Sequence, residues 1–253
     1  MNENVITLKG VRKVFRDFWL RPTVAAVDGL ELGVERGEVF GLLGPNGSGK
    51  STTIKMILGL LAPSAGEVKL FGLEPRSRSA RRRLGYLPEL SYLHPFLTAR
   101  ETLRYYAGLA DLDRRTAAAR TAELLEMVGL AEVADRAVGA FSKGMARRVA
   151  LASSVIARPE LLVMDEPTSG LDPVSTKEVK TLIRALAAGG MTVLMTSHLL
   201  ADAEDVCDRV AILNHGRKVA EGRVAELGTS LEEFFLAKVG DIKAFRLAPF
   251  LKA

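Results

Sequence analysis

The sequence contains one cysteine, one tryptophan and no long run of apolar residues among its 253 positions. Because Cys207 stands alone, no internal disulfide is possible, and a reducing compartment suits the chain. No stretch approaches the roughly 18–20 apolar residues that a membrane-spanning helix needs. Residues 1–5 also lack the basic and then apolar order of a signal peptide. We therefore expect a globular protein with one large domain, or with a core and a subdomain.

No large excess of charge of either sign is present, since the net charge is only +5. The densest charged cluster lies at residues 76–83, which include five arginines. This cluster is either a solvated helix face or a contact for an acidic partner or lipid headgroups. Aromatic residues make up 6% of the chain and do not interleave with the arginines, so single-stranded nucleic acid is not favoured as a partner.

The sequence does contain a glycine-rich loop at residues 44–52, which fits the phosphate-binding pattern G-x-x-x-x-G-K-[ST]. Residues 38–43 predict a short buried strand before the loop, and residues 53–58 predict the opening of a helix after it. Glycines let the backbone curl tightly and bring its N–H groups onto phosphate oxygens, and the helix N-terminus adds the positive end of its dipole. The pattern predicts a nucleotide-binding site formed by Gly44, Pro45, Asn46, Gly47, Ser48, Gly49, Lys50, Ser51 and Thr52.

Two side chains of this loop have distinct chemical tasks. We expect the Lys50 ammonium to reach the β- and γ-phosphates and the Ser51 hydroxyl to bind Mg²⁺. A second predicted strand, residues 161–164, leads into Asp165 and Glu166. The carboxyl end of such a strand is where α/β sheets bind ligands, so Asp165 is expected to hold Mg²⁺, directly or through water. Glu166 is expected to orient the attacking water or to accept its proton.

Two other stretches carry candidate binding residues. Residues 192–196 predict a buried strand that leads to His198, whose neutral imidazole can hydrogen-bond the γ-phosphate region and hold the attacking water. Ser142 suits the N-cap of the helix that follows it, and Gly144 lets a ligand approach the backbone closely. Since residues 44–52 already hold the phosphates of one nucleotide, this second helix N-terminus is interpreted as serving the nucleotide of another chain.

The rest of the chain alternates predicted strands and helices. Thr98 and Glu101 have the spacing of a capping box, after which helical character continues almost unbroken to about residue 157. Gly189 and Gly190 end a helix that begins at Pro173. The other expected elements are a small antiparallel sheet from residues 5–8, 24–27, 30–34 and 67–71, a strand running into a loop at 84–89, a late hairpin at 210–220 and a helical start at 231–236.

These motifs, in this order, resemble those of the nucleotide-binding domain of an ATP-binding-cassette (ABC) transporter, and the resemblance covers essentially the whole chain. It implies that residues 44–52 are the Walker A motif and residues 161–166 the Walker B motif, with Glu166 as the catalytic base. It also implies that His198 is the switch histidine and that Asp172 belongs to the D-loop. The family signature, usually Leu-Ser-Gly-Gly-Gln, falls on residues 141–145, so nucleotide contacts are expected from Ser142, Lys143, Gly144 and Met145.

Two places depart from the family pattern. The glutamine of the Q-loop, which contacts Mg²⁺ and senses the γ-phosphate, is Glu89 here. Its carboxylate still suits the metal, but it adds negative charge near the phosphates. The signature has Lys143 and Met145 where glycine and glutamine are usual. Both variants resemble the stand-alone ATPase subunits of bacterial exporters of drugs, polysaccharides or sodium.

The resemblance implies an α/β fold, with a P-loop NTPase (RecA-like) core, a small antiparallel β subdomain and an inserted α-helical subdomain. Residues 1–253 then form a single nucleotide-binding domain. Its expected parts are the core at 1–88 and 160–228, the helical subdomain at about 89–159 and a C-terminal helical tail at 229–253. An aromatic side chain is expected to stack on adenine, with Phe15 as the first candidate and Phe18 and Trp19 as its competitors.

The resemblance favours an ATP-binding and ATP-hydrolysing subunit that powers a membrane exporter, with ATP and Mg²⁺ as its ligands. ATP would close a head-to-tail dimer, formed by two copies or with a homologous ATPase subunit. A separate transmembrane permease would be the partner, at the cytoplasmic face of the inner or plasma membrane. Residues 90–97 are the candidate docking surface for the permease, unless they pack inside the helical subdomain.

A second function remains open, that of a soluble ABC ATPase acting on nucleic acid, the ribosome or a cofactor-assembly scaffold. The single cassette and the lack of a long coiled-coil insertion argue against it, and no nucleic acid is expected as a partner. A P-loop kinase or a switch GTPase is a poorer interpretation, because it leaves the signature, the D-loop and His198 unexplained.

Overall fold

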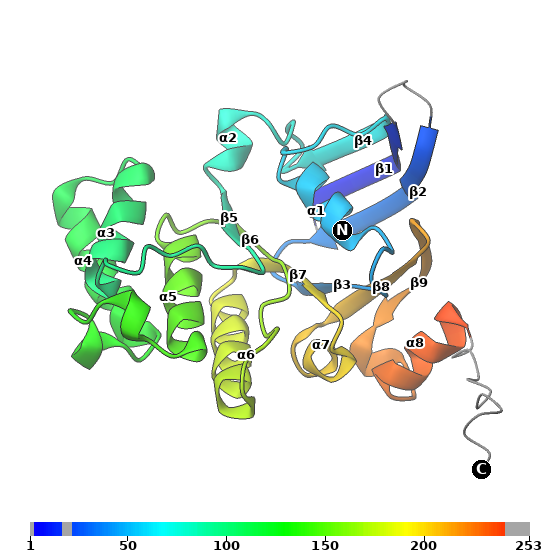
Figure 1. Cartoon of the computed structure of the whole chain (residues 1–253). Helices are drawn as coiled ribbons and strands as arrows, with labels where there is room; N and C mark the ends of the chain where they lie inside the picture. The colour runs from blue at the N-terminus through cyan, green and yellow to red at the C-terminus, as the bar shows by residue number, and fades with distance from the viewer. Residues whose placement is uncertain (1–2, 17–21, 241–253) are drawn as a thin grey trace, which may run out of the picture.

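The computed structural model describes residues 3–16 and 22–240 of the chain. Its strands are β1 (Asn4–Arg16), β2 (Pro22–Glu35), β3 (Val39–Leu43), β4 (Ala65–Leu70), β5 (Leu84–Leu87), β6 (Leu161–Met164), β7 (Thr192–Ser197), β8 (Arg209–Asn214) and β9 (Arg217–Arg223). Its helices are α1 (Lys50–Ile57), α2 (Arg78–Arg81), α3 (Ala99–Leu109), α4 (Arg114–Met127), α5 (Lys143–Val155), α6 (Pro173–Ala188), α7 (Leu200–Val206) and α8 (Leu231–Val239). Together they form the expected α/β fold, with two sheets (Figure 1).

The larger sheet has the strand order β5-β6-β7-β3-β8-β9. Neighbouring strands from β5 to β8 are parallel, and β9 pairs antiparallel with β8. Strands β3, β6 and β7 are buried along their whole length, as expected for apolar runs covered on both faces. Because these strands are parallel, the loops that follow β3, β5, β6 and β7 meet at one edge of the sheet.

The smaller sheet is antiparallel, as predicted, with the order β2-β1-β4. Its strands are longer than the sequence indicates, because β1 continues far beyond residue 8 and β2 joins the expected strands 24–27 and 30–34 into one. Gly10 and Gly29 interrupt the alternation of apolar and polar residues. Both have positive φ angles, 56° and 67°, and lie at register shifts of the β1–β2 pairing. They form bulges within long strands and not breaks between short ones.

Helices α3, α4 and α5 pack together as the mostly helical block expected in the middle of the chain, on the left of Figure 1. The predicted capping box begins α3, with hydrogen bonds between Thr98 and Glu101 in both directions. The prediction of an almost unbroken helix to about residue 157 is wrong. Asp111 and Gly129 adopt φ angles of 57° and 65° and turn the chain after α3 and after α4, so this region contains three separate α-helices.

Three predictions near the end of the chain are confirmed. Helix α6 begins at Pro173 and has Gly189 as its C-cap. Strands β8 and β9 form the late hairpin through His215 and Gly216, whose φ angles of 46° and 78° are those of a type I′ turn. Helix α8 begins after Ser230, whose side chain caps it.

The larger sheet lies between two apolar layers. On one face, Phe40 and Leu42 of β3 pack with the small sheet and α1, and on the other face Val39 and Leu43 pack with α5 to α8. Cys207 is buried in the second layer, where burial raises the pKa of its thiol and keeps it protonated. Within residues 3–16 and 22–240, no helix combines the length and the apolar character needed to cross a bilayer.

Candidate functional site

The phosphate loop passes between β2 and β8 with no room for side chains at two glycines. A Cβ on Gly49 would lie 2.5 Å from the carbonyl oxygen of Ala26, and a Cβ on Gly44 would overlap the carbonyl oxygen of Leu213. Gly49 also has a φ of 106°, in the region that favours glycine. Both glycines are therefore required by the path of the loop between β3 and α1.

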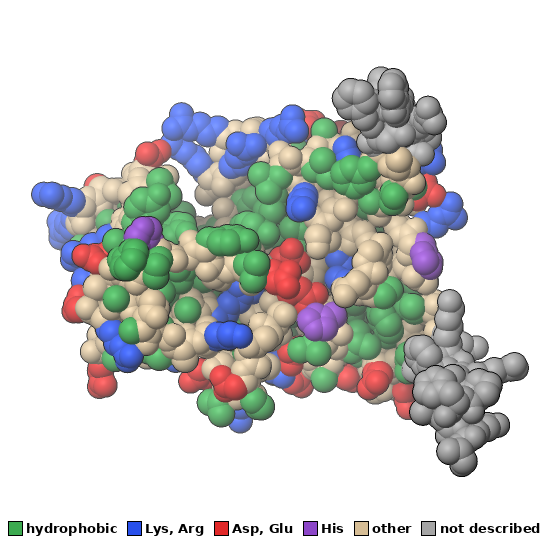
Figure 2. Space-filling model, in the orientation of Figure 1, with side chains coloured by type: hydrophobic (Ala, Val, Ile, Leu, Met, Phe, Trp, Pro, Cys, Tyr) green, Lys and Arg blue, Asp and Glu red, His purple; other side chains and the backbone are tan. Residues whose placement is uncertain are grey.

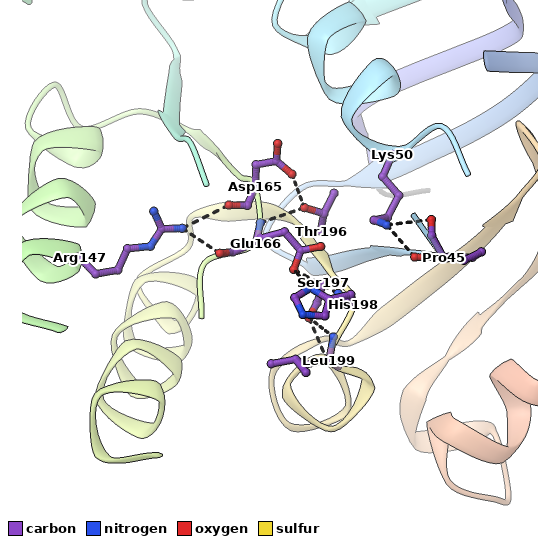
Figure 3. Close-up of polar contacts among 10 residues, drawn as sticks. Pro45, Lys50, Arg147, Asp165, Glu166, Thr196, Ser197, His198 and Leu199 are labelled. Atoms are coloured by element: carbon purple, nitrogen blue, oxygen red, sulfur yellow. Dashed lines mark hydrogen bonds and ion pairs between the residues drawn. The ribbon is translucent and has the colours of Figure 1, made fainter. Parts of the chain in front are cut away.

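Lys50, the first residue of α1, is 7% exposed, and its ammonium group turns back onto the loop (Figure 3). Its Nζ donates to the carbonyl oxygens of Gly44 (2.6 Å) and Pro45 (3.2 Å). Burial lowers the pKa of Lys50, and the charges of Glu166 and Asp165 act in the opposite direction. The loop thus holds a cation within electrostatic reach of the two carboxylates that follow β6.

The loop also offers the other donors that an anion needs. The first N–H groups of a helix have no acceptor within it, and none of the described side chains caps α1 at Gly49. Ser48 is 2% exposed, and its Oγ has no hydrogen-bond partner within the described part of the chain. Free N–H groups, an unpartnered hydroxyl and the Lys50 ammonium together suit the phosphates of a nucleotide.

Asp165 and Glu166 directly follow β6 and are fixed by Thr196 of the neighbouring strand β7. The Thr196 hydroxyl donates to Asp165 Oδ1 (2.6 Å) and accepts from the Glu166 N–H (3.0 Å), as Figure 3 shows. Thr196 is fully buried, so its position is set by the sheet. The two carboxylates predicted from the sequence therefore have a defined orientation.

Glu166 and His198 come together across the ends of β6 and β7 (Figure 3). Glu166 Oε2 accepts from the backbone N–H of His198 (3.2 Å) and lies 2.6 Å from His198 Nδ1. Because an ionised carboxylate only accepts, Nδ1 is the ring nitrogen that donates in this contact. Glu166 also has a φ of 49°, a left-handed conformation that is costly for a residue other than glycine and is found at functional sites.

A cavity of about 710 Å³ opens between the phosphate loop and these side chains, within the size range of small-molecule sites. The predicted site residues that line it are Phe15, Asn46, Gly47, Gly49, Lys50, Ser51, Thr52, Glu89, Glu166 and His198. Phe15 is 42% exposed near the end of β1, so its ring is available for stacking. The competing candidates Phe18 and Trp19 lie outside the described residues.

Four further residues line the cavity without having been predicted from the sequence: Val24, Ala25, Ala26 and His215. From the sequence, His215 is an ordinary turn residue, and it does lie in the turn between β8 and β9. That turn, however, packs between β2 and the phosphate loop. The Gly216 N–H donates to the Ser48 carbonyl (3.0 Å), and the Asp28 N–H donates to the Gly216 carbonyl (2.9 Å). Only this tertiary packing brings His215 to the cavity.

The described residues Ser142, Lys143, Gly144, Met145 and Asp172 are not among those that line the cavity. Ser142 caps α5 as predicted, because its Oγ accepts from the Met145 N–H (3.1 Å). Asp172 caps α6 and accepts from the N–H and the hydroxyl of Ser175; the hydroxyl contact is the main cause that lowers the pKa of Asp172. A Cβ on Gly144 would overlap Ser175 Oγ, so α6 of the same chain packs directly against this glycine.

Comparison with known proteins agrees with this geometry. The profile of the family described as ABC transporter matches residues 27–169. An uncharacterised ABC transporter ATP-binding protein from a Nostoc species is 41% identical over 227 residues, covering 88% of this chain and 68% of that protein. A Nod factor export ATP-binding protein I from Burkholderia pseudomallei is 44% identical over 217 residues, covering 83% of this chain and 71% of that protein. The chain thus spans only part of the length of these relatives.

Two solved structures are similar over most of the chain. The ATP-binding subunit of an ABC transporter matches with a TM-score of 0.81 at 30% identity, covering 93% of this chain and 100% of that one. A dimeric ATP-binding cassette in a post-hydrolysis state, bound to ADP and Pi, matches with a TM-score of 0.77 at 26% identity, covering 87% of this chain and 98% of that one. With its phosphate loop and paired strand-end carboxylates, the chain belongs to the ABC transporter family, as an ATP-binding protein and an ATPase.

Proposed function

We propose that this ATPase powers a membrane exporter, as the ATP-binding subunit of a complex whose channel is a separate permease. The observation that carries the proposal is that Lys50, Glu89, Glu166 and His198 all line the same cavity. Relatives named for Nod factor export support the direction of transport. The departures at Glu89 and Lys143, which resemble those of stand-alone exporter ATPases, support it as well.

Each residue of the cavity has a chemical task that its position supports. Lys50 and the uncapped N-terminus of α1 bind the phosphates of ATP, and Phe15 stacks on adenine. Glu166 accepts a proton from the attacking water, while His198 fixes the direction of its carboxylate through the 2.6 Å contact. If His198 is neutral with its proton on Nδ1, its Nε2 accepts a hydrogen bond from the attacking water.

Ser51, Asp165 and Glu89 are proposed to hold Mg²⁺, which when bound would neutralise charge on the phosphates. Ser51 and Glu89 line the cavity, and Thr196 orients Asp165. These oxygens suit Mg²⁺, which usually takes one or two carboxylates together with phosphate oxygens.

A second copy of the chain, or a homologous ATPase subunit, completes each site in this proposal. Ser142 and Gly144 lie at the N-terminus of α5, away from the cavity of their own chain. In a head-to-tail pair, each ATP lies between Lys50 and Ser51 of one chain and Ser142 and Gly144 of the other. If ATP binds the closed pair better than the open pair, binding shifts the population toward closure and hydrolysis reverses it. The similarity to a dimeric cassette supports this arrangement.

A groove on the helical side supports a permease as the partner. Its volume is about 540 Å³, and its lining combines Tyr86, Tyr92, Leu93, Tyr106 and Leu109 with Arg76, Arg78, Arg81 and Arg82. Tyr92 and Phe96 are each 83% exposed, so residues 90–97 are not wholly packed inside the helical block. Hydrophobic side chains gather on this face in Figure 2, with basic side chains above them. An apolar groove with an arginine rim suits an amphipathic helix that carries acidic residues.

The proposed division of the chain follows from this arrangement. The core comprises residues 1–88 and 160–228, the helical subdomain about 89–159, and the tail 229–253. The chain would be held at the cytoplasmic face of the inner or plasma membrane by the permease bound in the groove.

The test is affinity purification of a Glu166→Gln variant from detergent-solubilised native membranes, with mass spectrometry of the proteins that accompany it. This variant is expected to bind ATP without turnover and to accumulate the closed complex. We expect a multi-span membrane protein in stoichiometric amount. It should be lost when Tyr92→Asp is added, and retained when Tyr105→Asp is added instead. Tyr105 is a matched control because it is 57% exposed on α3 but is not among the residues that line the groove.

Other outcomes would change the proposal in different ways. Recovery of only ribosomal proteins, RNA or an assembly scaffold would replace the exporter with the soluble alternative and leave the ATPase assignment intact. Equal recovery of a membrane protein with and without Tyr92→Asp would retain the exporter but place its docking surface elsewhere.

A further inference from the structure

Arg147 is a buried charged residue to which the proposed reaction assigns no task. It lies in α5, a few residues after Ser142, and is 6% exposed. Its guanidinium donates hydrogen bonds to six neutral oxygens from two loops of the larger sheet. A guanidinium has five N–H donors in a fixed planar fork, so all of its donors can be used at this position.

The first of these loops follows β6 and carries Glu166. Arg147 Nη2 donates to the carbonyl oxygens of Asp165 (3.2 Å) and Glu166 (3.0 Å), and Nε donates to that of Pro167 (2.8 Å). Figure 3 shows the side chain reaching from α5 to Asp165 and Glu166. Three consecutive carbonyl groups are therefore held by one side chain.

The second loop follows β5 and carries Glu89. Arg147 Nη1 donates to the carbonyl oxygens of Pro88 (2.5 Å) and Glu89 (3.1 Å) and to Ser91 Oγ (3.0 Å). Pro88 and Ser91 also line the groove proposed for the permease. The same guanidinium thus connects the groove, the Glu89 loop and the Glu166 loop.

The conformation of Glu166 explains what this connection can do. Its left-handed backbone, with a φ of 49°, persists only if neighbouring groups hold it. Thr196 binds the Glu166 N–H from β7, and Arg147 binds the Glu166 carbonyl from α5. The peptide groups on both sides of the Glu166 Cα are therefore fixed, and with them the direction in which its carboxylate leaves the backbone.

A purely structural role does not explain why an arginine occupies this position. Burying a guanidinium costs free energy, and an apolar side chain of similar volume would fill the space at lower cost. Burial lowers the pKa of Arg147 to about 10, so the side chain remains charged at neutral pH. A lysine has one nitrogen and cannot span both loops as the guanidinium does.

We propose that Arg147 is a positioning residue for ATP hydrolysis, which locks the Glu89 loop to the Glu166 loop and thereby directs the Glu166 carboxylate. The proposal rests on the proposed role of Glu166 as the base. Arg147 is not among the residues that line the nucleotide cavity, so its effect falls on turnover and not on nucleotide binding.

The test compares Arg147→Met and Arg147→Lys with Arg148→Met in the full-length ATPase. Arg148 is a matched control on the same helix, because its side chain is 16% exposed and donates to the Val128 carbonyl (2.8 Å) within the helical block. We measure kcat, KM for ATP and the nucleotide Kd, each per folded molecule as determined by circular dichroism. Arg147→Met should lower kcat on the order of 10- to 100-fold, with KM and Kd changed less than about twofold. Arg148→Met should leave kcat nearly unchanged.

Equal kcat losses in Arg147→Met and Arg148→Met would overturn the proposal, as would an unchanged kcat in both Arg147 variants. If Arg147→Met does not fold, Arg147→Lys decides, since it keeps the charge and most of the length. Glu166→Gln in the same assay separates this proposal from the one on which it rests. Full turnover by Glu166→Gln would place the base elsewhere, whereas an inactive Glu166→Gln beside an unaffected Arg147→Met would reject only the positioning role.

Discussion

At the scale of single residues, Glu160 shows how one carboxylate joins distant segments of the chain. It accepts two hydrogen bonds from Arg83 (2.5 and 2.8 Å) and one from Arg36 (2.8 Å). These contacts, with Arg83 the larger cause, lower the pKa of Glu160 from 4.5 to about 2. Because the pKa of Glu160 is lowered in the folded state, its contacts contribute to stability at pH values above the unfolded pKa. This contribution is lost as the pH falls through the folded pKa. The contribution of Glu160 to stability is therefore lost between pH 4.5 and about 2.

Glu160→Gln should lower the free energy of unfolding at pH 7 by about 1 kcal/mol, a value reduced for solvent screening because the side chain is 41% exposed. The difference from the wild type should shrink as the pH falls below 4.5. Urea unfolding at neutral pH and at successively lower pH values measures it. Glu123→Gln is the control, since Glu123 and its partner Arg158 are both largely exposed and should contribute little. A difference that grew on acidification would contradict the argument.

A functional residue can be predicted from the sequence where the neighbouring residues along the chain identify it. The phosphate loop is identifiable because it matches a fixed sequence pattern. Glu166 is identifiable because it comes directly after a buried strand. His215 and Arg147 have no such signal. One looks like any turn residue and the other like any arginine on a helix. The turn that carries His215 and the side chain of Arg147 are held by segments far away in the sequence, so only the folded chain shows where they lie.

At the scale of elements, the first turns of α5 and α6 pack so closely that one of them requires a glycine. Alanine in place of glycine ordinarily stabilises a helix by roughly 0.5–1 kcal/mol. At Gly144 the sign should reverse, because the added Cβ would overlap Ser175 Oγ. We expect Gly144→Ala to destabilise the protein by about 1–3 kcal/mol, the usual cost of overpacking, as measured by urea unfolding.

Two further variants make this prediction specific. Gly108→Ala in α3 is the matched control, since its added Cβ would have no described atom from outside its own stretch of helix within 4 Å, and it should be neutral or stabilising. Ser175→Gly removes the atoms that clash, so the double variant should recover part of the loss caused by Gly144→Ala. Equal effects of alanine at Gly144 and Gly108 would mean that the contact between α5 and α6 relaxes without cost.

Elements are predictable from the sequence where burial and capping are local. Strands β3 and β6 are apolar runs, β7 has an apolar centre, and α3 and α5 begin at side chains that cap them. The extents of β1 and β2 are not predictable in this way. Gly10 and Gly29 read as breaks, yet pairing between the two strands converts them into bulges. The prediction of an almost unbroken helix fails for a related reason. The turn at Asp111 depends on a single residue in the left-handed conformation, within a sequence that favours helix.

At the scale of the whole molecule, the signature residues and the nucleotide cavity belong to different parts of one chain. If a second chain brings Ser142 to the cavity, Ser142→Arg should block hydrolysis and leave ATP binding by the single chain unchanged. The added side chain would obstruct the contact with the partner's nucleotide. Steady-state ATPase rates and calorimetry measure the two effects. Ser230→Arg at the start of α8 is the control, because it also removes a helix N-cap, at a site remote from the signature.

Mixing two inactive variants tests the head-to-tail geometry directly. In a pair formed by Ser142→Arg and Glu166→Gln, one site carries both defects, whereas the other combines the intact Glu166 of one chain with the intact Ser142 of its partner. ATPase activity should therefore return on mixing, although neither variant turns over alone. A pair in which each chain used its own Ser142 and Glu166 would place one defect in each site and would stay inactive. Activity that did not return, from a mixture shown by cross-linking to contain mixed dimers, would rule out the shared site.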